Sequence, residues 1–190
     1  MRVEIEIKLR LSGELAKIRR ALRQLGFHLT KPRALESNTL FDNSKRSLRK
    51  QGMIVRVRVT GGRRVLTYKG PSKTGKYKQR QEIEFHLPRE AFLEAILAHM
   101  GYHPVFRYEK YRAEYSRASD LGIVLVDETP IGNFLELEGP PRWIDETAHL
   151  LGFSQSDYIT RSYGYLYLAF CRERRIRPKD MLFEDRRLKK

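Results

Sequence analysis

Charged and aliphatic residues alternate strictly near the start of the chain. Because the side chains of a strand alternate between two faces, Glu4, Glu6 and Lys8 lie on one face and the aliphatic residues on the other. The pattern predicts a strand over residues 2–10. Two carboxylates on one face, about 7 Å apart, can hold a divalent cation through oxygen ligands. The alternative is an ordinary half-buried strand that turns its charges to water.

Seven further segments carry strand patterns, which brings the number of predicted strands to eight. They cover residues 38–42, 52–60, 63–69, 79–87, 105–115, 122–127 and 133–138. The clearest signal is a hairpin in which valines alternate with Arg56 and Arg58, Gly61 and Gly62 form the turn, and the chain returns over residues 63–69.

Apolar residues at helical spacing predict helices between these strands. The first follows Ser12, its expected N-cap, and ends at Gly26. Another covers residues 91–100, and we expect Phe92, Ile96 and Met100 to face the core. The last helix carries an apolar stripe that we expect to pack against the sheet. The stripe consists of Tyr163, Leu166, Tyr167 and Phe170.

One supersecondary unit occurs three times. Three of the predicted strands contain the pattern Glu-x-Glu, which begins at Glu4, Glu82 and Glu136. Each of these strands leads through a helix to a glycine followed by an aromatic residue. These stops are Gly26-Phe27, Gly101-Tyr102 and Gly152-Phe153. The repetition predicts a pseudo-symmetric sheet whose equivalent faces converge, with helices on the apolar sides of the strands.

The charged faces of these strands therefore point toward one another, with acidic and basic residues interleaved. They carry Glu4, Glu6, Lys8, Arg56, Arg58, Lys69, Arg80, Glu82, Glu84, Lys110, Arg112, Asp127, Glu136 and Glu138. A closed barrel tolerates a charged interior only if the groups pair or hold ionic ligands. A chain of phosphates fits this mixture, because Arg and Lys bind its oxygens and a metal held by carboxylates bridges them.

Composition adds a strong positive charge. The 190 residues have a formal net charge of +15, which predicts polyanionic partners. Residues 174–190 hold eight Lys/Arg and three Asp/Glu, and we expect them to form a solvated basic extension of a single domain over residues 1–173. Cys171 stands alone, so no disulfide framework is predicted. No apolar run approaches the length of a membrane span, and we expect a cytoplasmic protein without a membrane partner.

The motifs in this order resemble those of the CYTH domain family, also called the triphosphate tunnel metalloenzymes. The resemblance covers roughly residues 2–170 and rests on Glu4-x-Glu6-x-Lys8, Arg56-x-Arg58, Lys69, Arg80-x-Glu82-x-Glu84, Lys110-x-Arg112, Asp127 with the turn that follows it, and Glu136-x-Glu138. It implies an α+β fold, an eight-stranded antiparallel β-barrel with helices packed outside. The family includes class IV adenylate cyclases, thiamine triphosphatases and inorganic triphosphatases.

The resemblance also implies roles for the residues. Glu4, Glu6 and Glu138 look like ligands of Mg²⁺ or Mn²⁺, with Glu136 and Asp127 as further ligands or as carboxylates that orient water. Glu82 and Glu84 would ligate a second metal or hold the basic side chains. The triphosphate clamp would consist of Lys8, Arg56, Arg58, Lys69, Lys110 and Arg112, with Arg80 and Arg161 as additional contacts or as surface residues.

These expectations favour hydrolysis of a small triphosphate to orthophosphate, with inorganic, thiamine or nucleoside triphosphate as the substrate. The runner-up is a cyclase that makes cyclic AMP and pyrophosphate, because the same tunnel serves both reactions. A non-catalytic binder of polyphosphate or nucleotide is a third hypothesis, and a nucleic-acid partner is not expected. The oligomeric state stays open, with a homodimer among the options. The stretch Gly70–Lys76 resembles a P-loop, but Tyr77 replaces the metal-binding hydroxyl and a strand is predicted to follow.

Overall fold

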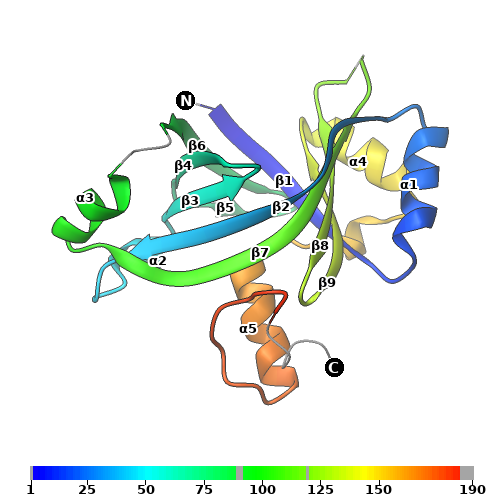
Figure 1. The fold of residues 1–190 in the computed structure, drawn as a ribbon. Coiled ribbons are helices and arrows are strands. Elements are labelled where there is room, and N and C mark those ends of the chain that lie inside the picture. The colour runs from blue at the N-terminus through cyan, green and yellow to red at the C-terminus, as the bar shows by residue number, and fades with distance from the viewer. Residues whose placement is uncertain (1, 89–91, 119, 185–190) are drawn as a thin grey trace.

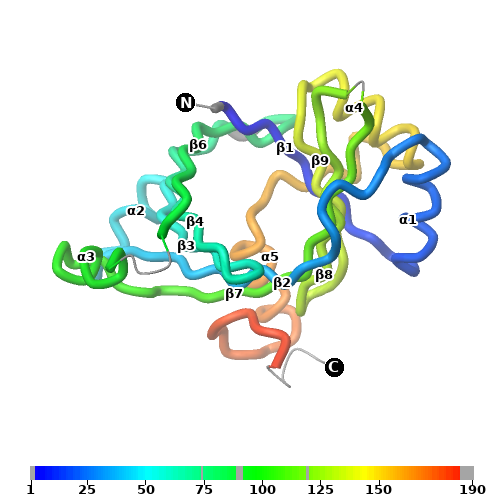
Figure 2. The backbone as a smooth tube through the Cα atoms, turned by 45° about the horizontal axis from the view of Figure 1, so that its top comes forward, coloured from blue at the N-terminus to red at the C-terminus, as the bar shows by residue number. Residues whose placement is uncertain are grey.

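Eight antiparallel strands close into a barrel in a computed structural model that describes residues 2–88, 92–118 and 120–184 (Figures 1 and 2). The strands are β1 (Arg2–Leu11), β2 (His28–Asp42), β3 (Ile54–Thr60), β4 (Arg63–Lys69), β6 (Lys78–Leu87), β7 (His103–Ser116), β8 (Ile123–Thr129) and β9 (Gly132–Glu138). Their order is β1-β9-β8-β7-β2-β3-β4-β6, and pairing of β6 with β1 closes the barrel. The short strand β5 (Lys73–Thr74) pairs with the start of β6. The predicted fold is confirmed.

Two helices cover the outer face of β1, β9 and β8. They are α1 (Leu15–Gln24) and α4 (Pro141–Leu150), on the right of the barrel in Figure 1. Their Leu22 and Ile144 are fully buried, together with Ile7 and Leu9 of β1. Because the aliphatic residues of these strands face this core, the charged residues of alternate parity face the inside of the barrel.

The three glycines that end the repeated units adopt one conformation. Gly26, Gly101 and Gly152 have φ of +80°, +81° and +84°, in the left-handed region that favours glycine. In each case the aromatic residue that follows donates its backbone N–H five residues back, as Phe27 does to the Leu22 carbonyl at 2.9 Å. The repeat in the sequence is thus a repeated Schellman stop that turns each helix back to the barrel.

A second core closes one end of the barrel, where α5 (Tyr163–Glu173) packs. Tyr163 and Tyr167 are buried there against Phe134 of β9, as the apolar stripe predicted. The segment after α5 joins this core, because Met181 is fully buried and bridges β7, with Met181 N–H to the Arg107 carbonyl at 2.9 Å. The basic extension is therefore not solvated along its whole length. Its last residues, 185–190, lie outside the described residues.

Three details differ from the predictions. Strand β2 begins at His28 rather than at residue 38, because bulges near Lys31 break the alternation that would reveal it. Helix α1 has Glu14 as its N-cap rather than Ser12, since β1 continues to Leu11 in register with β9.

The third difference is the helix predicted over residues 91–100. Helix α3 covers Leu93–His99, and the predicted start at residue 91 lies outside the described residues. Phe92, Ile96 and Met100 do not face a core, being 79%, 55% and 65% exposed. Periodicity identifies the apolar face of a helix but not what covers it.

The short α2 (Ser47–Lys50) follows β2. None of the described helices is long and apolar enough to cross a membrane.

Candidate active site: a charged tunnel

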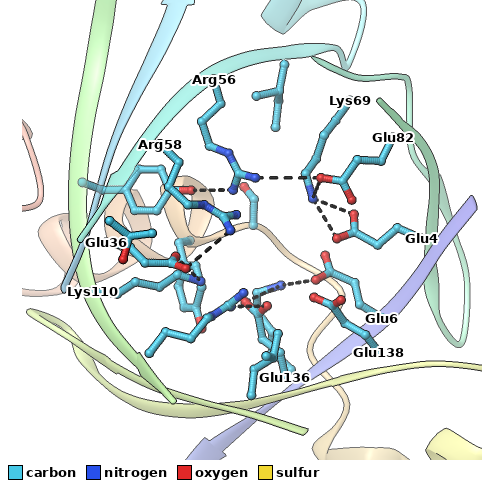
Figure 3. Close-up of a pocket in the computed structure, with 18 of the residues that line it drawn as sticks. Glu4, Glu6, Glu36, Arg56, Arg58, Lys69, Glu82, Lys110, Glu136 and Glu138 are labelled. Carbon is cyan, nitrogen blue, oxygen red and sulfur yellow. Dashed lines mark hydrogen bonds and ion pairs between the residues drawn. The ribbon is translucent and has the colours of Figure 1, made fainter. Parts of the chain in front are cut away.

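The inward faces of the strands line a cavity of about 320 Å³ in the barrel (Figure 3). Thirteen of the predicted site residues lie on its wall: Glu4, Glu6, Lys8, Arg56, Arg58, Lys69, Arg80, Glu82, Glu84, Lys110, Arg112, Glu136 and Glu138. Nearly all of them are buried or half-buried. The volume falls within the range of small-ligand pockets, and the polarity of the wall suits an ionic ligand.

Carboxylates gather on one side of the cavity, where β1 pairs with β9. Glu4, Glu6 and Glu138 each place a carboxylate oxygen within 4.8 Å of the others. Burial, followed by the negative charges of Glu4 and Glu136, raises the pKa of Glu138 to about 7. The negative charge around Glu138 is therefore incompletely compensated. A set of oxygen donors alone is what Mg²⁺ and Mn²⁺ prefer, so these residues fit a hard divalent cation.

Lysine side chains pair with the members of this cluster. Lys69 bonds both oxygens of Glu4, at 2.7 and 2.8 Å, and also lies 3.0 Å from Glu82. Lys8 lies 3.2 Å from Glu6 and 3.3 Å from Glu136.

The remaining oxygen of Glu6 accepts a hydrogen bond from Lys78. Burial acts to raise the pKa of Glu6, but Lys8 and Lys78 outweigh burial and hold the pKa below its usual range. Glu6 is therefore ionised at neutral pH and available to a metal.

The opposite wall is basic and is organised around Glu36 of β2. Its carboxylate lies 3.4 Å from Arg58 and 3.7 Å from Lys110. Burial acts to raise the pKa of Glu36, but Lys110, Arg112 and other cations lower it to about 2. Arg56 lies nearby and donates to the hydroxyls of Thr67 and Tyr108, at 3.1 and 3.4 Å. In Figure 3 the basic group around Glu36 and the group of Glu4, Glu6 and Glu138 face each other across the cavity.

Asp127 lies behind this wall rather than on it. It is fully buried and accepts hydrogen bonds from Lys110 at 2.9 Å, Arg112 at 2.6 Å and the Tyr163 hydroxyl at 2.7 Å. Arg112 also bonds Glu136 at 2.5 Å. With its oxygens occupied in this way, Asp127 is placed to hold the two basic side chains rather than to ligate a metal.

Two predicted phosphate contacts have contrasting surroundings. Arg80 is 7% exposed, and its Nε and Nη1 have no hydrogen-bond partner among the described residues. Buried guanidinium donors without acceptors are costly, so an anion would fit there. Arg161 lies outside the cavity, exposed, with its guanidinium 4.7 Å from the centre of the Tyr165 ring. The structure therefore brings Arg80, but not Arg161, to the tunnel.

Among the wall residues that sequence reasoning missed are Glu36, Lys78, Tyr108 and Tyr163. Lys78 shares the parity of Arg80 and Glu82 and was missed because the strand was expected to start at residue 79. Tyr108 shares the parity of Lys110 in the same way. Glu36 precedes the predicted start of β2. Tyr163 was expected only in the core, but the centre of its ring also lies 5.3 Å from the ammonium nitrogen of Lys8.

The P-loop resemblance has no counterpart in the structure. The stretch Gly70–Lys76 contains β5 and leads into β6 rather than into a helix. Lys76 bonds Asp145 of α4 at 2.6 Å, and the hydroxyls of Tyr77 and Tyr158 donate to the same carboxylate at 2.7 and 3.0 Å. These contacts tie the loop to the outside of the barrel.

The model of the CYTH domain family matches residues 2–163. The chain belongs to the CYTH domain family. A relative named "Putative adenylate cyclase", from Methanocaldococcus jannaschii, is 29% identical over 136 residues, which are 72% of this chain and 76% of the relative.

Solved structures show the same fold at low sequence identity. A "putative adenylate cyclase" from Vibrio parahaemolyticus is 19% identical, with a TM-score of 0.75 over 87% of this chain and 97% of that one. A "putative adenylyl cyclase" from Hippeastrum, described as having a dominant triphosphatase activity, is 16% identical, with a TM-score of 0.64 over 90% of this chain and 96% of that one. The names of this relative and these structures thus refer to two kinds of activity, adenylate cyclase and triphosphatase.

Proposed function

We propose that this protein is a metal-dependent triphosphatase that releases orthophosphate from a small triphosphate bound in the tunnel. The observation that carries the proposal is the carboxylate cluster of Glu4, Glu6 and Glu138, whose oxygens lie within 4.8 Å of one another, beside a wall of buried Arg and Lys side chains. A pure anion binder gains nothing from such carboxylates. With a metal they complete the usual machinery of phosphoryl transfer, which depends on positioning and charge neutralisation.

Glu4, Glu6 and Glu138 would hold Mg²⁺ or Mn²⁺, which supplies a Lewis acid for the phosphoryl oxygens. Arg56, Arg58 and Lys110 lie on the opposite wall and would bind the phosphate oxygens. These side chains are held in place before the substrate arrives, because Glu36 and Asp127 pair with Arg58 and Lys110, and Arg56 donates to the hydroxyls of Thr67 and Tyr108. Such preorganisation reduces the reorganisation needed as charge develops in the transition state.

The attacking water needs a carboxylate on the cavity wall. Glu136 lies there and is 4% exposed, whereas Asp127 lies behind the wall. Burial acts to raise the pKa of Glu136, but Arg112 and Lys8 hold it well below its usual value. Glu136 is therefore a carboxylate at neutral pH that can accept a hydrogen bond from water and orient it. Asp127 would act as a positioning residue for Lys110 and Arg112.

The second candidate is an adenylate cyclase. The names of the relatives from Methanocaldococcus jannaschii and Vibrio parahaemolyticus support it. The description of the Hippeastrum protein supports hydrolysis in a fold of the same kind. Hydrolysis needs only the charged wall, whereas cyclisation also needs a site that holds adenosine with its 3′-hydroxyl in line with the α-phosphate.

A product assay tests the proposal. The protein is incubated with inorganic triphosphate, thiamine triphosphate or ATP, each with Mg²⁺, Mn²⁺ or EDTA, and orthophosphate, pyrophosphate and cyclic AMP are measured separately. We expect metal-dependent orthophosphate, and we expect Glu6→Gln to lower its rate at least about 100-fold, because the variant loses a ligand charge. Cyclic AMP with equal pyrophosphate would establish the cyclase instead. Binding of triphosphate that is insensitive to EDTA, without any product, would establish a non-catalytic binder.

A further inference from the structure

The lysines that pair with the carboxylate cluster differ in the number of their carboxylate partners. They would therefore be affected differently if the carboxylates turned to a metal. Lys8 contacts both Glu6 and Glu136, at 3.2 and 3.3 Å. Lys69 contacts both Glu4 and Glu82, at 2.7 and 3.0 Å. Each of these lysines therefore retains a carboxylate partner when one is withdrawn.

Lys78 differs from these two lysines in its number of carboxylate partners. Its ammonium group pairs with Glu6, and it has no second carboxylate partner in the described part of the chain. The side chain is 7% exposed, so water does not take the place of a partner. A buried ammonium group without a counter-charge is costly, and it must find another anion or leave the cavity.

Lys78 lies beside a second cation that already lacks acceptors. Arg80 is two residues further along β6, on the same face, with Nε and Nη1 unpartnered. Strand pairing places Arg80 opposite Glu4 and Lys78 opposite Glu6. Side chains directly opposite each other in an antiparallel pair have Cβ atoms about 5 Å apart. The two cations thus flank two of the three carboxylates that would hold the metal.

We propose that Lys78 is a substrate-binding residue that is available only to the metal-loaded protein: it pairs with Glu6 in the free protein and, together with Arg80, binds a phosphate group once Glu6 turns to the metal. This inference rests on the proposed function of the tunnel. It makes the binding of metal and triphosphate mutually favourable, because each ligand removes the electrostatic cost of the other.

Two binding measurements on Lys78→Met test it. The first is calorimetric titration with Mn²⁺ alone. Since the ammonium group competes with the cation for Glu6, we expect the variant to bind Mn²⁺ about tenfold more tightly than the unsubstituted protein, the scale of one charge-assisted hydrogen bond.

The second measurement uses an imido analogue of triphosphate, whose P–N–P links resist hydrolysis. In EDTA, where Lys78 is tied to Glu6, the variant should bind the analogue as well as the unsubstituted protein does. With saturating Mn²⁺ it should bind about tenfold more weakly, because one phosphate contact is missing. The opposite signs of the two effects distinguish this role from loss of structure, which weakens both.

Lys73→Met serves as the matched control, because Lys73 is exposed on the adjacent β5 and should change neither affinity. Lys78→Arg keeps the charge and should retain most of the coupling. If Lys78→Met fails to fold, Lys78→Gln gives the same two measurements with a neutral side chain that still donates a hydrogen bond.

The outcomes separate this inference from the proposed function. If the unsubstituted protein binds Mn²⁺ and hydrolyses triphosphate, but neutral variants of Lys78 leave the Mn²⁺ affinity unchanged, the inference alone is wrong. The same holds if the analogue binds equally well to both proteins in Mn²⁺. If the unsubstituted protein binds no divalent cation, the proposed function and the inference both fail.

Discussion

Glu36 is the carboxylate that keeps the basic wall of the tunnel together, and its removal gives a quantitative prediction. It is 6% exposed and lies between Arg58 and Lys110. These and neighbouring cations lower its pKa from 4.5 to about 2, against the opposing effect of burial. A shift of this size corresponds to roughly 3 kcal/mol of folding free energy at neutral pH. We expect Glu36→Gln to be destabilised by about that amount.

For a chain of this length, 3 kcal/mol lowers the melting temperature by about 6–12 °C, which thermal unfolding followed by circular dichroism can measure. The pH dependence gives a second test. Because the folded pKa lies below the unfolded one, the contribution of Glu36 is complete above about pH 5 and is lost as the pH falls toward 2. The difference in stability between the unsubstituted protein and Glu36→Gln should fall to roughly half or less by pH 3.

Binding of the imido analogue of triphosphate should offset part of the stability that Glu36→Gln loses. Without Glu36, the cations of the basic wall lack their counter-charge, so the analogue should bind Glu36→Gln more tightly and restore part of its lost stability. Glu114→Gln is the matched control, because Glu114 also lines the cavity but pairs with the exposed Lys31, and such pairs contribute little. Equal stability of Glu36→Gln and the unsubstituted protein at pH 7, or a difference that does not shrink in acid, would refute this account of the basic wall.

Three further substitutions test other parts of the structure. Arg56→Ala should weaken binding of the triphosphate analogue by about 2–4 kcal/mol, because a buried charge-assisted contact is lost, and an unchanged affinity in calorimetry would remove Arg56 from the clamp. Met181→Ala should lower the free energy of unfolding by about 2–5 kcal/mol in urea titrations, since Met181 is fully buried, whereas Met100→Ala on the exposed face of α3 should have little effect. Asp145→Ala should cost about 1–3 kcal/mol, because the carboxylate accepts three side-chain hydrogen bonds; a variant as stable as the unsubstituted protein would show that the loop is not held there.

The sequence predicted the barrel and most of the charged residues of its wall because strict alternation assigns each residue of a strand to one face. Glu4, Glu6 and Lys8 could be placed on the wall from the alternation of β1 alone, because the apolar residues of β1 must face the core and the charged residues then face the cavity. The same argument did not find Glu36, because residues 28–37 show no regular alternation of polar and aliphatic residues, so the strand was predicted to start only at residue 38. Nor could it separate Asp127 from the residues on the wall. Asp127 has the correct parity, but whether a side chain is covered by its neighbours depends on packing between strands.

The helix over Leu93–His99 shows a different limit. Its apolar face is as regular in sequence as that of α1, yet α1 buries Leu22 completely and α3 buries none of its residues. Helical periodicity reports which side chains share a face, whereas burial depends on whether the connections bring that face to a sheet. Met181 shows the reverse case, because the charge of the C-terminal extension predicted solvation, and its contact with β7 depends on a strand edge far away in the sequence.

The arrangement of charges explains how a barrel can keep an ionic interior without its ligands. Carboxylates that would hold a metal are paired with lysines, and the arginine and lysine side chains that would hold phosphate are paired with Glu36 and Asp127. On binding, a metal would replace lysine as the counter-charge of the carboxylate cluster, and a triphosphate would add acceptors for the basic side chains, which keep Glu36 and Asp127 beside them. Arg80 and Glu138 are incompletely compensated, since Arg80 has two donors without acceptors among the described residues and Glu138 has its pKa raised to about 7. An anion would supply the acceptors that Arg80 lacks, and a cation would lower the pKa of Glu138. Both residues lie where we expect the metal and the triphosphate to meet, so the charges of the free protein are least compensated there.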